Sequence, residues 1–247
     1  MAAPATSPMR ISVVIPVWHD SAALRQTLQM PRQPGDEWIV VNGDPADATL
    51  DDLRRAHRDV SWLDGAKGRG VQVAVGAASA TGDWVLVLHA DTRLAAGWRD
   101  EVTGAAAAAS YEWGCFRLRL DASAWQARLI EAAVRARVRV FRLPYGDQAM
   151  FFRRSTLERL GGVPAVPLME DVALARRFAR TGPLFRSPLP ATTSARRWER
   201  DGWWRRTLRN WLLVTRYLLG ESPDRLATAY APEGVPQGGS TTGTTRC

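Results

Sequence analysis

The most constraining feature of this sequence is an apolar run, residues 84–88, that ends in His89, Ala90 and Asp91. Because no polar residue alternates within it, the run predicts a strand that is buried on both faces. In an open α/β sheet, ligands bind at the carboxyl ends of the strands. Asp91 is therefore either a carboxylate for a divalent cation that holds a diphosphate, or a cap of the next turn. The residues of this run alone leave these two interpretations balanced.

Similar strands alternate with helical segments in the first half of the chain. We expect strands at 11–17, 37–41 and 60–63, and helices at 21–30, where Ser21 is the cap, 50–57 and 68–80. This alternation predicts an α/β fold with a parallel sheet. The loops that follow three of the strands, residues 18–20, 42–44 and 89–91, should then converge on one crevice where a nucleotide could lie.

The second half is predicted to contain further helices and strands. Helices are expected at 97–109, 124–141 and from 170 to about 180, strands at 114–120 and 149–152, and a brief helix capped by Ser155. Glu170 and Asp171 fall in the first turn of their helix, where the helix dipole favours acids. Spacing alone therefore favours N-terminal capping for these two acids.

The helix expected at 202–219 has an unusual composition. One stripe carries apolar residues, and arginines lie mainly away from it; the stripe is Trp204, Leu208, Trp211, Leu212, Thr215 and Leu219. A basic amphipathic helix of this kind either lies on an anionic membrane or packs its stripe on the parent domain. Packing on the domain is the favoured interpretation.

Composition limits the classes of partner and location. The net charge is +8, and Lys67 is the only lysine, so arginine supplies the excess. This charge favours an anionic partner: a nucleotide, a phosphorylated acceptor or a membrane surface. Nucleic acid is not expected, because the basic residues are not interleaved with aromatics along one platform. No apolar stretch or leader pattern predicts a membrane span or secretion, so we expect a cytoplasmic protein or one at the inner face of the membrane.

Composition also indicates how the chain divides into domains. Residues 1–9 and 231–247 are small, polar and rich in proline, glycine or threonine, which predicts disorder. Residues 10–230 are expected to form one domain with two halves. We expect a nucleotide-binding half at 10–95 and an acceptor-binding, catalytic half at 96–230.

A series of short motifs, in order, resembles glycosyltransferase family 2, which has the GT-A fold. More narrowly, it is similar to the bacterial arsenosugar-biosynthesis-type, radical-SAM-associated branch. The motifs are Val-Val-Ile-Pro-Val (13–17), Ile-Val-Val-Asn-Gly (39–43), Gly-Arg-Gly-Val-Gln (68–72), Leu-His-Ala-Asp-Thr (88–92), Tyr-Gly-Asp-Gln-Ala (145–149), Gly-Gly-Val-Pro (161–164), Leu-Met-Glu-Asp-Val (168–172) and Ser-Ala-Arg-Arg-Trp (194–198). The resemblance implies a Rossmann-like, mostly parallel sheet flanked by helices, with amphipathic helices at the C-terminus.

The resemblance also implies a donor site for a nucleotide-diphosphate-sugar, with a UDP-sugar expected. Its residues would be Pro16, Val17, Trp18, Asp20, Asn42, Arg69, His89, Ala90 and Asp91. Asp91, with His89 as second ligand, would bind Mg²⁺ or Mn²⁺, of which manganese tolerates imidazole better. Asn42 and Ala74 depart from the aspartate and asparagine usual in the family, and residues 44–48 depart from its usual turn.

For the reaction, the resemblance implies an inverting transfer to a hydroxyl acceptor whose identity the sequence does not give. Asp171 would be the general base, and Glu170 would tune or position it. The acceptor and phosphate side would use Gly146, Asp147, Gln148, Arg196, Arg197 and Trp198. Two alternatives stay open: a membrane-surface transferase acting on a polyprenyl phosphate, and a degenerate nucleotide-binding protein, which the altered donor turn would suit.

Overall fold

The structure, a computed structural model, describes residues 9–230. Residues 1–8 and 231–247, for which disorder is predicted, lie outside the described residues. Met9 belongs to the predicted disordered segment, but it packs against the core, and Arg99 donates a hydrogen bond to its carbonyl. The prediction is therefore wrong at this residue, because an apolar side chain next to the first strand finds a partner.

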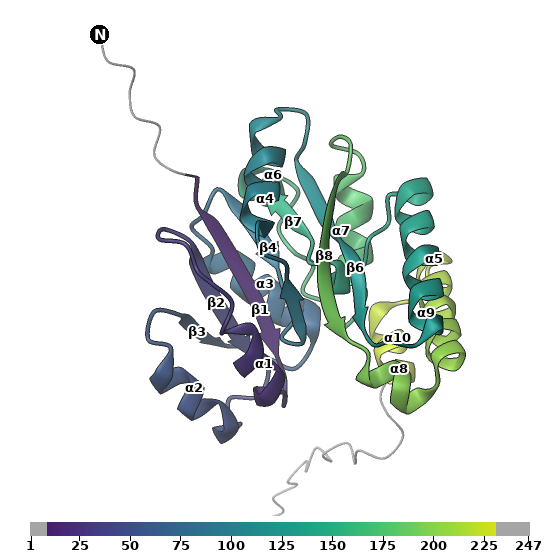
Figure 1. Cartoon of the computed structure of the whole chain (residues 1–247), viewed down its shortest axis with the longest axis horizontal. Coiled ribbons are helices and arrows are strands. Elements are labelled where there is room, and N and C mark those ends of the chain that lie inside the picture. The colour runs from purple at the N-terminus through teal and green to yellow at the C-terminus, as the bar shows by residue number, and fades with distance from the viewer. Residues whose placement is uncertain (1–8, 231–247) are drawn as a thin grey trace, which may run out of the picture.

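One eight-stranded sheet runs through the molecule, in the order β3-β2-β1-β4-β7-β6-β8-β5 (Figure 1). The strands are β1 (Ile11–Val17), β2 (Glu37–Asn42), β3 (Ser61–Asp64), β4 (Trp84–Val87), β5 (Thr92–Leu94), β6 (Trp113–Asp121), β7 (Phe151–Arg153) and β8 (Phe185–Ser194). The pairs β1–β2, β2–β3, β1–β4 and β6–β8 are parallel; β4–β7, β6–β7 and β5–β8 are antiparallel. The predicted α/β fold is confirmed, with β5 and β8 as additional strands.

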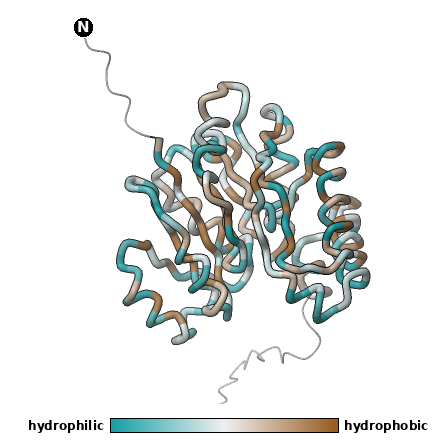
Figure 2. Tube along the Cα trace, in the orientation of Figure 1, coloured by the Kyte–Doolittle hydropathy of each residue, from teal (hydrophilic) through white to brown (hydrophobic). Residues whose placement is uncertain are grey.

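Helices cover both faces of this sheet because its strands are apolar on both sides. One face packs on α1 (Ser21–Thr27), α2 (Asp51–Ala56) and α4 (Trp98–Ala107). The other packs on α3 (Arg69–Ser79), α5 (Trp125–Phe141), α6 (Arg154–Arg159) and α7 (Glu170–Phe178). The chain continues through α8 (Arg196–Asp201), α9 (Trp203–Leu218) and α10 (Pro223–Tyr230), with short 3₁₀ turns η1 (Ala48–Leu50) and η2 (Gly146–Gln148). Figure 2 shows hydrophobic residues gathered along the central strands.

The sheet curls because of the short connection between β4 and β5. In the sheet order, β7, β6 and β8 separate these two strands. Four strand spacings in a flat sheet would be about 19 Å. The chain from Val87 to Thr92 could reach about 18 Å only if fully extended, and it instead turns, with Thr92 N–H donating to the His89 carbonyl at 3.0 Å. The segment 88–91 therefore joins the middle of the sheet to its curled edge.

Two predicted helix caps are wrong. Ser21 is the first residue of α1, and Asp20 occupies the N-cap position. Ser155 lies inside α6, whose N-cap position is Arg153, the last residue of β7. In the second case the helix follows directly from a strand, which leaves no loop for a separate capping residue.

The favoured interpretation of the C-terminal helix is also wrong. The stripe predicted to pack on the domain is exposed: Trp204, Leu208, Trp211 and Leu212 are each between 51% and 61% accessible. The buried residues of α9 are Arg206, Leu213 and Val214. Leu213 and Val214 pack on α7 and α10, and the buried Arg206 pairs with Asp201 at 3.2 Å. The helix therefore attaches to the domain through a face that includes a paired arginine, and its aromatic stripe stays about half exposed.

Candidate active site

The carboxyl ends of six strands lie at one edge of the sheet. β1, β2, β3 and β4 run in the same direction, and β6 shares it because β4 and β6 are both antiparallel to β7 between them; β8 is parallel to β6. Asp20 and Asp91 lie in the loops that follow β1 and β4, and Asn42 is the last residue of β2. This arrangement gathers the predicted donor residues at the edge where ligands bind in α/β sheets.

Asp91 lies in an arginine-centred cluster at this edge. The Arg196 guanidinium forms a bidentate ion pair with Asp20 and lies 3.5 Å from the Asp91 carboxylate. Ser194 N–H donates to the Asp91 carbonyl at 3.1 Å. A polar cavity of about 180 Å³ opens beside this cluster, lined by Asp91, Arg93, Asp121, Ser194 and Arg196 among others. The cluster brings together two carboxylates and one guanidinium where a metal–diphosphate group could bind.

Asp171 is held in the same region by three donors. Its Oδ2 accepts hydrogen bonds from Gly146 N–H at 2.8 Å and from Arg69 Nη2 at 3.2 Å, and its Oδ1 accepts from Val172 N–H at 2.8 Å. Its side chain is 10% exposed. Each carboxylate oxygen has two lone pairs, so these bonds orient the group and leave it able to accept a proton.

Glu170 is placed differently from its neighbour. Its side chain is only 4% exposed, and one oxygen pairs with Arg69 Nε. The pKa of Glu170 is raised, mainly by burial. The Arg69 charge opposes this shift, and the nearby Asp171 charge adds to it. Glu170 therefore positions Arg69, whereas Asp171 keeps the partly accessible carboxylate.

His89 lies under Gly146. A Cβ built on Gly146 would lie 2.6 Å from His89 Nε2 and 3.4 Å from Asp171 Oδ2. Nε2 is buried and has no hydrogen-bond partner among the described residues. Burial, with Arg69 and Arg197 nearby, lowers the pKa of His89 well below its usual value, so the imidazole is neutral at pH 7. His89 and Asp171 thus flank a glycine whose missing side chain leaves room for both.

The pKa of Asp147 responds to the charges of both Asp91 and Asp171. Burial is the main cause that raises its pKa to about 6; the charges of Asp171 and Asp91 add to the shift, and those of Arg137 and Arg69 oppose it. One of its oxygens is buried without a partner in the part of the chain that the structure describes. Asp147 therefore lies within electrostatic reach of both Asp91 and Asp171.

The donor side has an exposed aromatic ring. Trp18 is 41% exposed, and Lys67 Nζ lies 4.3 Å from the centre of its ring. His19 pairs with Asp44 at 3.0 Å and with Asp47 at 3.5 Å. Asn42 is buried, and its amide bonds the backbone of Asp44, closing the turn on itself. Asn42 therefore shapes the altered turn, and the ring of Trp18 offers a surface for stacking.

Gln72 is a site residue to which the sequence analysis gave no role. It is buried on α3, and its Nε2 donates to the carbonyls of Val17 at 2.6 Å and Val41 at 2.8 Å. It thereby ties the ends of β1 and β2 together beneath the donor loops. The motif Gly-Arg-Gly-Val-Gln contains this residue, and a polar side chain on the buried face of a helix was the available signal.

Two residues predicted for the acceptor side serve packing instead. Trp198 is buried against Leu118 and Leu120 of β6, and its Nε1 donates to Thr207 at 3.2 Å. Gln148 is buried and bonds Arg137 and the carbonyl of Phe116. Arg197 is exposed. Pro16, Val17 and Ala90 are buried and offer the site main-chain positions only.

The residues fit a one-carboxylate metal site only in part. Across residues 9–230 there is no group of three or more His, Cys, Asp and Glu side chains that could hold a metal. Asp91 could supply one oxygen, with donor phosphates supplying others. His89 does not fit the predicted role of second ligand, because it faces Gly146 and Asp171 while Asp91 faces Arg196.

Comparisons with known proteins give the family of the chain. The model of "Glycosyl transferase family 2" matches residues 12–158, which is more than half of the chain. The chain belongs to glycosyl transferase family 2. This is the family that the motifs predicted. No curated protein sequence matches it.

Solved structures with this fold include residues 1–349 of S. aureus TarS. The complex with UDP-GlcNAc has a TM-score of 0.58 at 13% identity, covering 75% of this chain and 58% of that one. The complex with UDP has a TM-score of 0.57 at 14% identity, covering 76% and 61%. The form without nucleotide in its description has a TM-score of 0.58 at 12% identity, covering 88% and 68%. The chain thus spans about three fifths of the length of the two nucleotide complexes, and the match shows the GT-A-type fold.

Proposed function

We propose that this family 2 enzyme transfers a sugar from a nucleotide-diphosphate-sugar, with UDP as the expected nucleotide, to an acceptor hydroxyl with inversion. One observation carries the proposal: Asp171 is a largely buried carboxylate, 10% exposed, that is oriented by Gly146, Arg69 and Val172 beside the edge that carries Asp91. The TarS structures, which hold UDP-GlcNAc and UDP in the same fold, support a UDP-sugar donor.

In the proposed reaction, the acceptor oxygen attacks the anomeric carbon from the face opposite the diphosphate. The new glycosidic bond forms as the bond from carbon to the phosphate oxygen breaks, and the electron pair leaves with the diphosphate. Asp171 takes the proton of the attacking hydroxyl, which contributes about 10²–10⁴-fold to the rate in comparable enzymes.

The leaving diphosphate must be neutralised by cations. Arg196 and Arg69 are the guanidiniums closest to the two acids, and guanidinium binds phosphate in a bidentate manner. A divalent ion held by Asp91 would add Lewis-acid stabilisation of the diphosphate when bound. Asp91 and Asp20 compensate the Arg196 charge.

The test is a pair of variants. Asp171→Asn should still be stabilised thermally by UDP, because it lacks only the base, but should lose transfer and UDP-GlcNAc hydrolysis. Asp91→Asn should lose the extra stabilisation that Mn²⁺ gives to UDP binding. Asp224→Asn, on exposed α10, is the matched control and should behave as wild type. Full turnover in Asp171→Asn would refute its role as base.

Finer assignments rest on the motifs. We propose a nucleotide-binding half at 10–95, a catalytic half at 96–230, and membership of the arsenosugar-biosynthesis-type branch. Among the described residues, no helix is long and apolar enough to cross a membrane. A second candidate function, transfer to a polyprenyl phosphate at the membrane surface, is favoured by one observation, the exposed aromatic stripe of α9.

A further inference from the structure

The exposed apolar side chains gather on two neighbouring helices. Of the eleven large apolar residues that are exposed among residues 9–230, ten lie on α5 or on α9 and its C-cap. We call these ten the α5–α9 face: Trp125, Leu129, Val140, Phe141, Trp204, Leu208, Trp211, Leu212, Leu218 and Leu219. Monomers rarely leave so many large apolar side chains exposed in one place without a partner.

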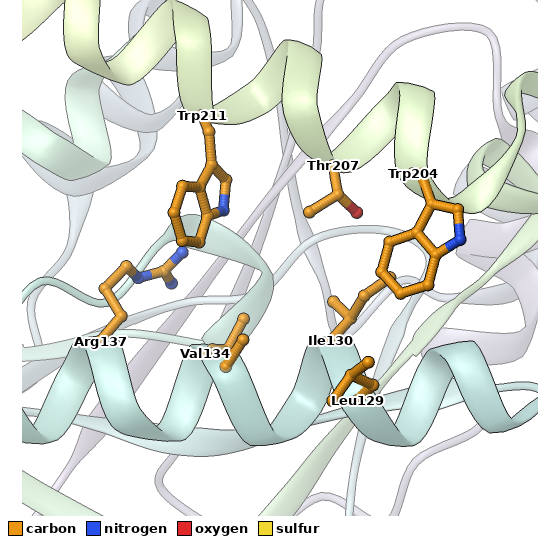
Figure 3. Close-up of a pocket in the computed structure, with 8 residues that line it drawn as sticks. Leu129, Ile130, Val134, Arg137, Trp204, Thr207 and Trp211 are labelled. Atoms are coloured by element: carbon orange, nitrogen blue, oxygen red, sulfur yellow. The ribbon is translucent and has the colours of Figure 1, made fainter.

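The two helices form a continuous surface with a groove between them. The groove has a volume of about 170 Å³ and is lined by Leu129, Ile130, Ala133, Val134, Arg137, Trp204, Thr207 and Trp211. Figure 3 shows Trp204 and Trp211 of α9 pointing toward Leu129, Ile130 and Val134 of α5. The rings of Trp125 and Trp204 lie 6.0 Å apart, which joins the two stripes at one end.

Cationic side chains flank this face. Arg135 and Arg139, four residues apart on α5, lie on one side of its apolar stripe, and Arg205 borders the stripe of α9. All three side chains are exposed. None of the three has an ion-pair partner in the described part of the chain. A helix surface with tryptophan and leucine bordered by unpaired arginines is the composition of helices that lie in an anionic lipid interface.

We propose that the α5–α9 face docks on the surface of an anionic membrane. The indoles and leucines would enter the boundary between headgroups and acyl chains, and the arginines would meet lipid phosphates. This docking is independent of the chemistry proposed above, so it stands or falls on separate measurements.

Two other occupants fit less well. A second copy of the chain, related by a twofold axis, would bring one arginine border against another, and like charges disfavour such a contact. The chain's own segment 231–247 contains only Ala231, Val235 and Cys247 as hydrophobic residues, too few to cover ten large side chains.

The position of the face suits an enzyme that works at a surface. α5 begins four residues after β6 ends, and β6 ends at the same sheet edge as β4. α8 and α9 follow the end of β8, which is parallel to β6. Both helices therefore begin near the edge that carries Asp91, so a docked enzyme would hold this edge near the lipid headgroups.

The experiment is flotation with vesicles of 70% phosphatidylcholine and 30% phosphatidylglycerol, compared with pure phosphatidylcholine. We expect wild type to float with the anionic vesicles and to bind the neutral ones at least tenfold more weakly. Trp204→Gln combined with Trp211→Gln should lower partitioning at least tenfold. The triple variant Arg135→Gln, Arg139→Gln, Arg205→Gln should do the same for anionic vesicles only.

A matched control removes three exposed arginines elsewhere, Arg25→Gln, Arg58→Gln and Arg186→Gln, and should float as wild type. Circular dichroism checks that each variant is folded. If wild type stays with the soluble fraction, or if the control loses as much binding as the flanking triple variant, the proposal is overturned. A wild-type dimer in sedimentation that the tryptophan variant converts to monomer, without vesicle binding, would assign the face to a second copy instead.

Discussion

The backbone N–H of Gly146 donates a 2.8 Å hydrogen bond to Oδ2 of Asp171, across 25 residues of sequence. The same glycine lies against the ring of His89. The loop 145–149 therefore fixes the carboxylate that we assign as the base and covers the imidazole that precedes Asp91. A side chain at this position would disturb both contacts.

Gly146→Ala should lower turnover strongly, because its Cβ would lie 2.6 Å from His89 Nε2 and must displace the ring or the loop. We expect a loss of about 10²-fold, as a shift of the order of 1 Å in a catalytic group can cause. Gly104→Ala on α4 is the control: nothing lies within 4 Å of its Cβ, so it should keep activity and gain about 0.5–1 kcal/mol in stability. Steady-state kinetics and urea unfolding of both variants provide the measurement, and wild-type kcat in Gly146→Ala would contradict this reading.

Arg196→Ala should weaken binding of UDP, because a charge-assisted bond to phosphate contributes about 1.5–3 kcal/mol. We expect the Kd for UDP, measured by calorimetry, to rise at least tenfold. Arg200→Ala removes an exposed arginine from the same helix and should leave the Kd unchanged. An unaltered Kd in Arg196→Ala would show that this guanidinium only pairs with Asp20 and Asp91 and does not bind phosphate.

Gln72→Leu should destabilise the protein and its donor site together. The substitution leaves the carbonyls of Val17 and Val41 without their side-chain partner, and an unsatisfied buried acceptor costs about 1–3 kcal/mol. Gln29→Leu, at an exposed position of the turn that follows α1, is the control. Urea unfolding measures the loss of stability, and the thermal shift with UDP measures the effect on the donor site. A variant as stable as wild type would argue against the role of Gln72 in connecting β1 and β2.

Asp147 should make stability depend on pH. Its pKa is raised from 3.8 to about 6 in the folded protein, so folding favours the protonated acid. This contribution is fully present below pH 3.8 and is lost as pH rises through about 6, a change on the order of 3 kcal/mol.

Asp147→Asn should remove that dependence and be more stable than wild type at pH 7.5. The difference in unfolding free energy between the two proteins, measured from pH 4.5 to pH 7.5, should grow with pH. A difference that stays constant over this range would contradict the assigned pKa.

The sequence predicted the strands of the first half well because β1, β2 and β4 are apolar on both faces and end in polar residues. It missed β8, in which Pro188 and Pro190 weaken the strand pattern. Asp20 and Asp91 were predicted as site residues, but their bridge by Arg196 depends on contacts up to 176 residues apart. The exposure of the α9 stripe could not be predicted either, because periodicity shows that a helix face is apolar but not whether another element buries it.

The short segment between β4 and β5 has a consequence for how the pocket responds to a donor. Asp91 belongs to a short segment that is joined at both ends to strands of one curled sheet, so its backbone has little freedom. An insertion in this segment would reduce the curvature of the sheet. Asp171 stands on a helix outside the sheet, after Met169 in a left-handed conformation. If the pocket closes around a donor, we therefore expect α7 and Asp171 to move, while Asp91 keeps its position relative to the sheet.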